Sequence, residues 1–188
     1  MTADERHWYF AGRRRVVNAV LTQHLLPRTA RRILDVTREA EGLRPLVATF
    51  GAVTHAACAA LPSGKWDVAC AFDALAPVSG IDTLSTLREH LVWDGQVVVT
   101  APSLPGYTRT QLVSHLSSAG FQVTFVSHFN AVLLPAVVAS RALGGLIPKP
   151  RSELLNRALT ELFGAESFLI GRASVPVGAA IIAVAQRR

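Results

Sequence analysis

The segment 33–42 constrains the fold more than any other part of the sequence. Three apolar residues surround Asp35, a pattern that predicts a buried parallel strand. A helical pattern of apolar residues begins at Leu43, after a short loop. A strand, a loop and a helix in this order form one half of a doubly wound α/β sheet, in which ligands bind beyond the carboxyl ends of the strands. The sequence therefore predicts an α/β fold with a ligand crevice at that edge.

The loop after this strand lacks the glycines that a nucleotide-binding loop uses. Glycine is needed there because the backbone turns tightly and approaches the ligand too closely for a Cβ atom. The chain instead has Thr37, Glu39 and Glu41 at alternate positions. Two carboxylates would repel an anionic ligand group, which backbone N–H groups at a helix N-terminus otherwise attract. Taken alone, the segment leaves open an ordinary strand and loop that hold no ligand.

Four further segments follow one another at the spacing of a known family. They are His7–Arg15, Lys65–Leu75, Arg88–Ala101 and Tyr107–Phe121. Together with the strand at Asp35, they resemble the class I S-adenosylmethionine-dependent methyltransferases of the small bacterial type. The resemblance implies a Rossmann-like methyltransferase fold, with a mostly parallel sheet and an antiparallel last strand. It implies a single domain over residues 1–188, with an N-terminal helix or lid in 1–30 and helical segments in 129–165.

The chain departs from this family where the family binds its cofactor. The positions that correspond to the family's cofactor-binding residues are Asp35, Thr37, Glu39, Glu41 and Phe72. Positions 37, 39 and 41 are those of the family's three glycines. The family also places an acidic residue at the end of its second strand, where it holds the ribose hydroxyls, but here the candidate strand ends in His55. We therefore regard these positions as vestigial and expect no cofactor.

The connection after the second strand is too short for the family's full topology. Only the residues from His55 to Lys65 precede the next strand at Trp66. The family fits a helix, a third strand and a loop near the adenine into this interval, and a full crossover needs about a dozen residues or more. We predict that the third strand and its helix are deleted. The strand order would then be 2-1-4-5-7-6 in the family's numbering.

Apolar spacing and turn signals predict the remaining elements. Capping boxes at Ser79 and Thr108 would begin two helices. The other expected elements are a helix at Arg13–Leu26, a strand at Phe121–Val126, a helix at Ser152–Phe163 and a last strand at Val177–Ala185. Polar residues, a proline and two glycines interrupt the apolar stretch Phe129–Ile147. That stretch therefore predicts a strand end and an amphipathic helix, not a membrane span.

Composition limits the class of protein. The chain has 188 residues, 50% of them hydrophobic, which predicts a folded domain with a core of ordinary size. Its net charge of +6 at pH 7 comes from scattered basic residues without a nucleic-acid motif, so nucleic-acid binding is not expected. Cys58 and Cys70 lack metal-ligand spacing, so no metal site is expected. We predict reduced thiols and a cytoplasmic location, because the N-terminus does not have the pattern of a signal peptide.

Candidate catalytic residues are Asp73 and His55, because each ends a strand at the edge where open α/β sheets bind ligands. A helix-capping Asp73 and a surface His55 are the alternatives. Further candidates for the substrate pocket are His7, Trp8, Tyr9, Arg13, Tyr107, His128 and Asn130. The resemblance implies that the first four form a lid, although an aromatic cluster that pins the N-terminus remains an alternative. The last three would come from loops on the substrate side.

Three functions remain open. The favoured one is a methyltransferase-like protein that has lost its S-adenosylmethionine site and acts as a non-catalytic partner or small-molecule binder. The second is a repurposed cofactor-free enzyme of a biosynthetic pathway, such as a cyclase or isomerase, because such reactions depend mainly on shape and orientation. The third is a true S-adenosylmethionine-dependent methyltransferase with an atypical loop. We also expect a homodimer, formed through the exposed sheet edge or the segment 131–147.

Overall fold

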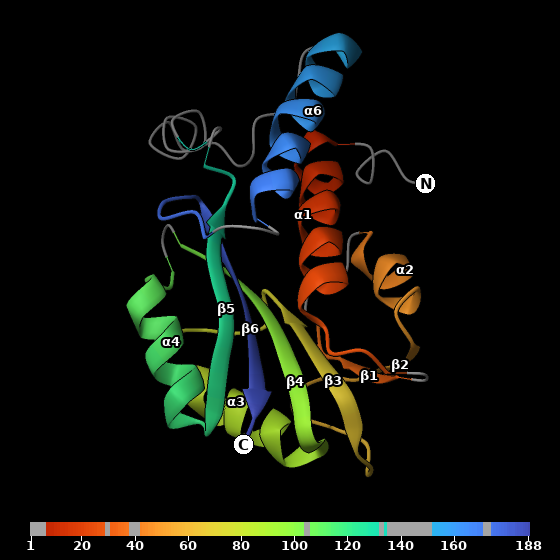
Figure 1. Ribbon diagram of the computed structural model, residues 1–188, viewed down its shortest axis with the longest axis vertical. Helices are drawn as coiled ribbons and strands as arrows, with labels where there is room; N and C mark the ends of the chain where they lie inside the picture. Colours follow the sequence, from red (N-terminus) through yellow and green to blue (C-terminus); the bar gives the residue numbers. More distant parts are fainter. Residues whose placement is uncertain are drawn as a thin grey trace.

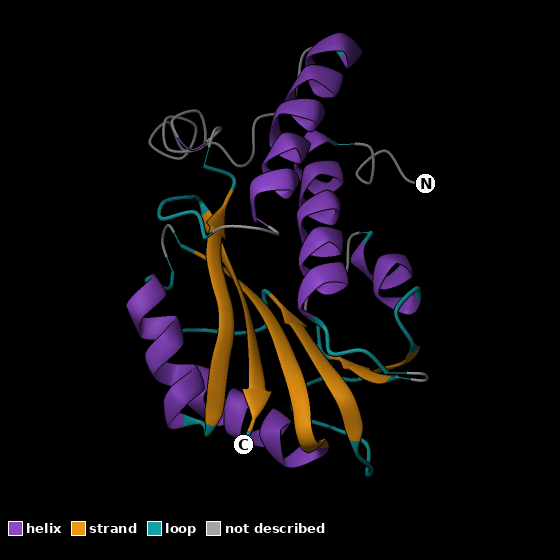
Figure 2. Cartoon of the chain, viewed as in Figure 1, coloured by secondary structure: helices purple, strands orange, loops and turns teal. Residues whose placement is uncertain are grey.

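A computed structural model shows a six-stranded sheet with helices on both faces (Figures 1 and 2). The structure describes residues 7–28, 31–37, 42–103, 106–131, 134, 152–170 and 174–188. The helices are α1 (Trp8–His24), α2 (Leu43–Ala48), α3 (Gly80–His90), α4 (Arg109–Ser118) and α6 (Glu153–Ile170). The strands are β1 (Arg32–Asp35), β2 (Ala52–His55), β3 (Trp66–Phe72), β4 (Leu91–Pro102), β5 (Phe121–Phe129) and β6 (Ala180–Arg187).

The strand order is β2-β1-β3-β4-β6-β5. The pairs among β2, β1, β3 and β4 are parallel, whereas β6 is antiparallel to both β4 and β5. This order is the predicted one once the family's third strand is removed. The described interval between β2 and β3 contains only an isolated bridge, between Ala57 and Ala60. Both the fold class and the deletion of the third strand are therefore confirmed.

Alternating side chains along the strands build two separate cores. On one face, residues such as Ile33, Cys70 and Val98 pack against α1, α2 and α6. On the other face, neighbours such as Leu34 and Ala69 pack against α3 and α4. A strand buried on both faces has an almost continuous apolar sequence, as the central strands of this chain do. The sheet therefore lies between two helical layers, and its carboxyl edge stays available for a site.

Helix α1 packs along α6, and the two meet closely at Gly12. A Cβ atom placed on Gly12 would lie 2.3 Å from Cδ1 of Phe163. The backbone N–H of Trp8 donates to Oδ1 of Asn156 at 2.8 Å. Figure 1 shows α6 alongside α1 and reaching beyond the sheet. These contacts fix the N-terminal helix to a segment that lies almost 150 residues later in the chain.

Several predicted boundaries were wrong. Helix α1 begins at Trp8, before the expected Arg13, because the ring of His7 accepts a hydrogen bond from the Tyr9 N–H and so caps the helix. The Thr108 capping box is confirmed, but Ser79 makes no side-chain cap hydrogen bond. Its ψ of 8° departs from the extended conformation that a capping side chain needs. Thus Ser79 precedes α3 without the reciprocal capping that Thr108 provides.

Other elements were found at shifted positions. Helix α6 continues to Ile170, beyond the predicted end, and β6 begins at Ala180, after the predicted start. Strand β5 continues to Phe129. Most of the apolar stretch that was predicted to form an amphipathic helix lies outside the described residues. Its predicted structure therefore stays a prediction.

The replacement Gly12→Leu tests the packing of α1 on α6. We expect it to lower the free energy of unfolding, because overpacking a close helix contact typically costs about 1–3 kcal/mol. This exceeds the gain of about 1 kcal/mol from removing a glycine from a helix. The replacement Ala158→Leu, at an exposed position of α6, is the matched control and should change stability by less than about 0.5 kcal/mol. Equal unfolding curves in urea for the two variants would contradict the close contact.

Candidate functional site

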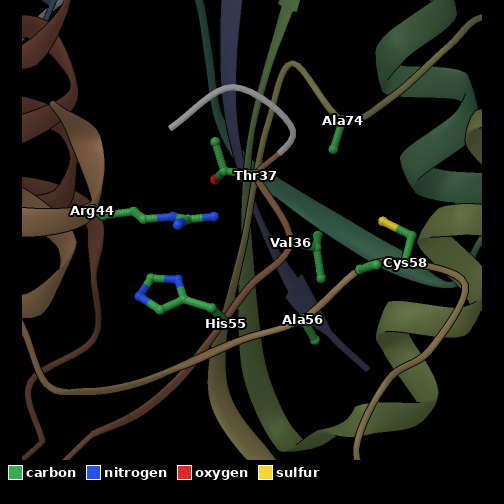
Figure 3. A pocket seen from close by; sticks show the side chains of 8 residues that line it. Val36, Thr37, Arg44, His55, Ala56, Cys58 and Ala74 are labelled. Atoms are coloured by element: carbon green, nitrogen blue, oxygen red, sulfur yellow. The ribbon is translucent and has the colours of Figure 1, made fainter. Parts of the chain in front are cut away.

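An open cavity of about 570 Å³ lies at the carboxyl ends of β1 and β2. Its lining residues come from the ends of these strands, from α2 and from the loop after β3. They are Val36, Thr37, Arg44, His55, Ala56, Ala57, Cys58 and Ala74. Figure 3 shows Arg44 and His55 on one side, with Cys58 on the other. The cavity thus lies where a doubly wound fold binds its ligand.

In the described part of the chain, Thr37 and His55 bind the carboxylate of Asp35. Its Oδ1 accepts from the Thr37 backbone N–H at 3.0 Å and also from the Thr37 hydroxyl. Its Oδ2 lies 3.0 Å from Nδ1 of His55. The Asp35 side chain is only 2% exposed, whereas that of His55 is 41% exposed. The pair therefore joins the ends of two adjacent strands and holds the imidazole at the cavity.

Asp73 takes part in a second polar cluster at the centre of the same edge. Its Oδ2 lies 2.6 Å from Nη2 of Arg13, and its Oδ1 accepts from the Thr100 hydroxyl at 3.0 Å. The same Arg13 nitrogen donates to the Thr100 oxygen at 2.9 Å. Arg13 is 5% exposed, and Asp73 has a positive φ of 53°. The cluster connects α1 to the ends of β3 and β4.

Tyr107 and His128 line a second cavity, of about 230 Å³, near the ends of β4 and β5. The Tyr107 hydroxyl donates to the Ala76 carbonyl at 2.9 Å, and burial raises the pKa of this phenol. Burial lowers the pKa of His128, and the nearby positive charge of Arg109 lowers it as well. A hydrogen bond to the Val175 carbonyl raises this pKa, but the net shift is downward. His128 is therefore biased towards its neutral form. The structure brings these two predicted residues together.

Asn130 is buried directly after the end of β5. It is 1% exposed and has a φ of 60°, and its backbone N–H donates to Oε2 of Glu166 at 2.5 Å. Its carboxamide has no hydrogen-bond partner within the described part of the chain. Asn130 is not among the residues that line the second cavity. Its backbone links the end of β5 to α6.

The aromatic residues at the N-terminus gather at the helix pair. Trp8 is 2% exposed and packs edge-on against Phe163, with ring centroids 6.1 Å apart. Tyr9 also lies beside Phe163, and the His7 ring lies against Trp8. None of the three lines either described cavity. Their role as a lid remains a prediction.

The remaining predicted positions divide into two groups. Phe72 is fully buried in the core beneath α1. Glu39 and Glu41 lie outside the described residues. Sequence reasoning missed Arg44 and Cys58, which line the cavity because of the short α2 and the turn after β2. The position of Arg44 could have been predicted from the sequence, because the helix that contains it follows the first strand after a short loop.

Burial raises the pKa of the Cys58 thiol, and burial, with the charge of Asp35, raises that of Cys70 well above its usual value. Neither thiol is therefore activated as a nucleophile. Over the described residues, no group of three or more histidine, cysteine or acidic side chains is arranged to hold a metal ion. None of the described helices is long and apolar enough to cross a bilayer.

Comparison with known proteins identifies the architecture. No family model matches the chain, and neither does any curated protein. Solved structures do match. The [4+2]-cyclase SpnF is 14% identical, with a TM-score of 0.55, over 93% of this chain and 80% of that one. An S-adenosylmethionine-dependent methyltransferase from Mesorhizobium loti is 14% identical, with a TM-score of 0.51, over 87% of this chain and 94% of that one.

A geranyl diphosphate methyltransferase in complex with GPP and sinefungin is 12% identical, with a TM-score of 0.56, over 92% of this chain and 77% of that one. The fold is that of the class I methyltransferases. The predicted resemblance is therefore confirmed at the level of architecture. At these identities the likeness says nothing about which ligand the cavity takes.

The replacement Asp73→Asn tests the central cluster. It would leave the Arg13 guanidinium buried without its counter-charge, and breaking a buried ion pair typically costs about 3–5 kcal/mol. Because the Asp73 side chain is 30% exposed, we expect a smaller loss of stability, about 2–3 kcal/mol.

Asp94→Asn is the matched control, because Asp94 also has a positive φ, 64°, and pairs with Arg28, but its side chain is 50% exposed. An exposed pair contributes about 1 kcal/mol or less. Chemical denaturation of both variants measures the difference. Equal losses would show that burial of Arg13 does not strengthen the Asp73 pair.

Proposed function

We propose that this protein keeps the methyltransferase fold, has lost productive binding of S-adenosylmethionine, and binds a different small molecule in the cavity at β1 and β2. The bonding of Asp35 carries the proposal. In the family resemblance, Asp35 begins the cofactor motif, yet both its oxygens are occupied by Thr37 and His55. His55 stands where the family holds the ribose hydroxyls with an acid. We infer that neither side chain holds the cofactor as it does in the family.

The lining of the cavity supports the same proposal. The family holds the ribose of S-adenosylmethionine with an acid at the end of its second strand. Among the described residues, the lining of the cavity includes Arg44 and His55 but no acid. The missing third strand also removes the element on which the family's adenine loop is built. The cavity is therefore open to a ligand but poorly matched to this cofactor.

Calorimetry with S-adenosylmethionine and S-adenosylhomocysteine tests the proposal. A hydrogen bond to a charged group contributes about 1.5–3 kcal/mol, so the loss of two or three contacts would weaken a micromolar ligand to about millimolar or beyond. We expect no measurable heat at micromolar cofactor concentrations. Restoring glycine at positions 37, 39 and 41 should not rescue binding by itself. A low-micromolar dissociation constant for the unaltered protein would instead support the true methyltransferase.

The Asp35–His55 pair favours a second candidate, a cofactor-free enzyme. A carboxylate that accepts from Nδ1–H fixes the tautomer and leaves Nε2 as the basic nitrogen, which suits proton transfer. One similar solved structure is a [4+2]-cyclase, so this fold is compatible with cyclisation chemistry. With a substrate in hand, His55→Gln separates the candidates. An enzyme would lose turnover while retaining binding, whereas a binding protein has no turnover to lose.

We also propose that the protein forms a homodimer in a reducing, cytoplasmic environment, in keeping with its two free thiols. Strand β2 pairs only with β1 in the described sheet, and Ala52, Thr54 and His55 are exposed. An open edge invites pairing with another chain. Light scattering after size-exclusion chromatography should give twice the monomer mass. A monomer that persists at high protein concentration would contradict the proposal.

A further inference from the structure

The lining of the larger cavity divides by chemistry. Its charged or ionisable nitrogens come from Arg44 and His55, its small polar groups from Thr37 and Cys58, and the remainder from small apolar side chains. We propose that this cavity binds a small organic anion, with a carboxylate or phosphate headgroup at Arg44, beside the ring of His55, and a compact apolar body against the opposite wall. This inference rests on the proposed function, because it assigns a ligand class to the same site.

Arg44 is the first argument for an anion. It is exposed on α2 and makes no hydrogen bond or ion pair within the described part of the chain. Many other arginines already donate to a carboxylate, carbonyl or hydroxyl. They are Arg13, Arg15, Arg28, Arg31, Arg88, Arg109, Arg157 and Arg187. Figure 3 shows the Arg44 guanidinium reaching into the space between Thr37 and His55. A forked donor in this position suits a carboxylate or phosphate.

His55 is the second argument. Its Nδ1 is held by Asp35 at 3.0 Å, so the ring has a fixed orientation and its other nitrogen makes no described hydrogen bond. Asp35 already pairs with His55, and none of the described residues that line the cavity is an acid that could pair with Arg44. An anionic group would therefore meet the Arg44 guanidinium, beside the fixed ring of His55, without displacing an internal ion pair.

The apolar wall limits the rest of the ligand. Val36, Ala56, Ala57 and Ala74 all have short side chains, which leave room for a ring or a short branched chain. The cavity volume of about 570 Å³ lies within the range of about 300–1,000 Å³ that is typical of sites for small molecules. The polar and apolar groups together therefore favour a small amphipathic anion over a polymer or an inorganic ion alone.

The test uses benzoate and phenyl phosphate as anionic probes and benzamide as the neutral probe, each titrated into the full-length protein and followed by NMR. We expect at least one anion to bind about tenfold or more tightly than benzamide, the gain from one charge-assisted hydrogen bond. The tighter of the two anions identifies the headgroup. The replacement Arg44→Gln should weaken that anion about 10- to 100-fold and leave benzamide unchanged.

Arg157→Gln is the matched control, because it removes the same charge from the exposed surface of α6. It should leave binding of the anion unchanged, and circular dichroism checks that both variants stay folded. Equal weakening by Arg44→Gln and Arg157→Gln would mean that the anion responds only to net charge, which would overturn the inference. Equal affinity for anions and benzamide would overturn it as well.

Cys58 provides an independent readout, since it lines the cavity whereas Cys70 is fully buried. The bound anion should slow modification of Cys58 by a thiol reagent, and this protection should be lost in Arg44→Gln. Binding without protection would place the anion elsewhere and overturn the inference. Calorimetry with S-adenosylmethionine decides the underlying proposal separately: tight cofactor binding overturns the proposed function, whereas absence of both cofactor and anion binding overturns the anion site alone.

Discussion

The buried carboxylate of Asp35 organises the edge of the sheet on which the larger cavity depends. A carboxylate can be buried only when hydrogen bonds replace its lost hydration. Here Thr37 and His55 supply those bonds. The bond to the Thr37 N–H holds the backbone directly after β1, and the bond to His55 orients the last side chain of β2. Asp35 therefore positions two of the residues that line the cavity, Thr37 and His55.

The Arg13–Asp73–Thr100 cluster divides the same edge into two parts. It lies at the ends of β3 and β4, whereas one cavity lies at β1 and β2 and the other near β5. In an open doubly wound fold, the crevice at this edge is where the ligand lies. In this protein, Arg13 of α1 reaches the middle of this edge, at the ends of β3 and β4. The two described cavities lie on either side of it, with no lining residue in common.

Much of the fold could be predicted because its signals are local or depend on length. The two-sided burial of β3 and β4 produces continuous apolar runs, and the short interval after His55 excludes a third strand and its helix. The start of α1 could not be predicted from apolar spacing, since it depends on the ring of His7 as a cap and on a contact between Trp8 and the distant Asn156.

The candidate site was predictable only in part, for a related reason. Asp73 and His55 could be predicted as site candidates because the apolar pattern shows where each strand ends. The carboxyl ends of parallel strands lie at the same edge of the sheet, where ligands bind. The partners of these two residues could not be predicted. Arg13 pairs with Asp73, and His55 pairs with Asp35. Both contacts depend on the directions of side chains from elements that are separated in the sequence. Arg44 was missed because its place in the lining of the cavity depends on how α2 packs beside β1 and β2, which only a three-dimensional structure shows.

The position of β6 has a consequence for how the protein folds. Strands β4 and β5 are not paired with each other, because β6 lies between them and binds both. The sheet therefore cannot close until residues 180–187 have been synthesised, although β5 ends at Phe129. Long-range strand pairing of this kind slows folding and leaves strand edges exposed in intermediates. A nascent chain halted before β6 would expose the edges of β4 and β5 that β6 covers in the folded protein.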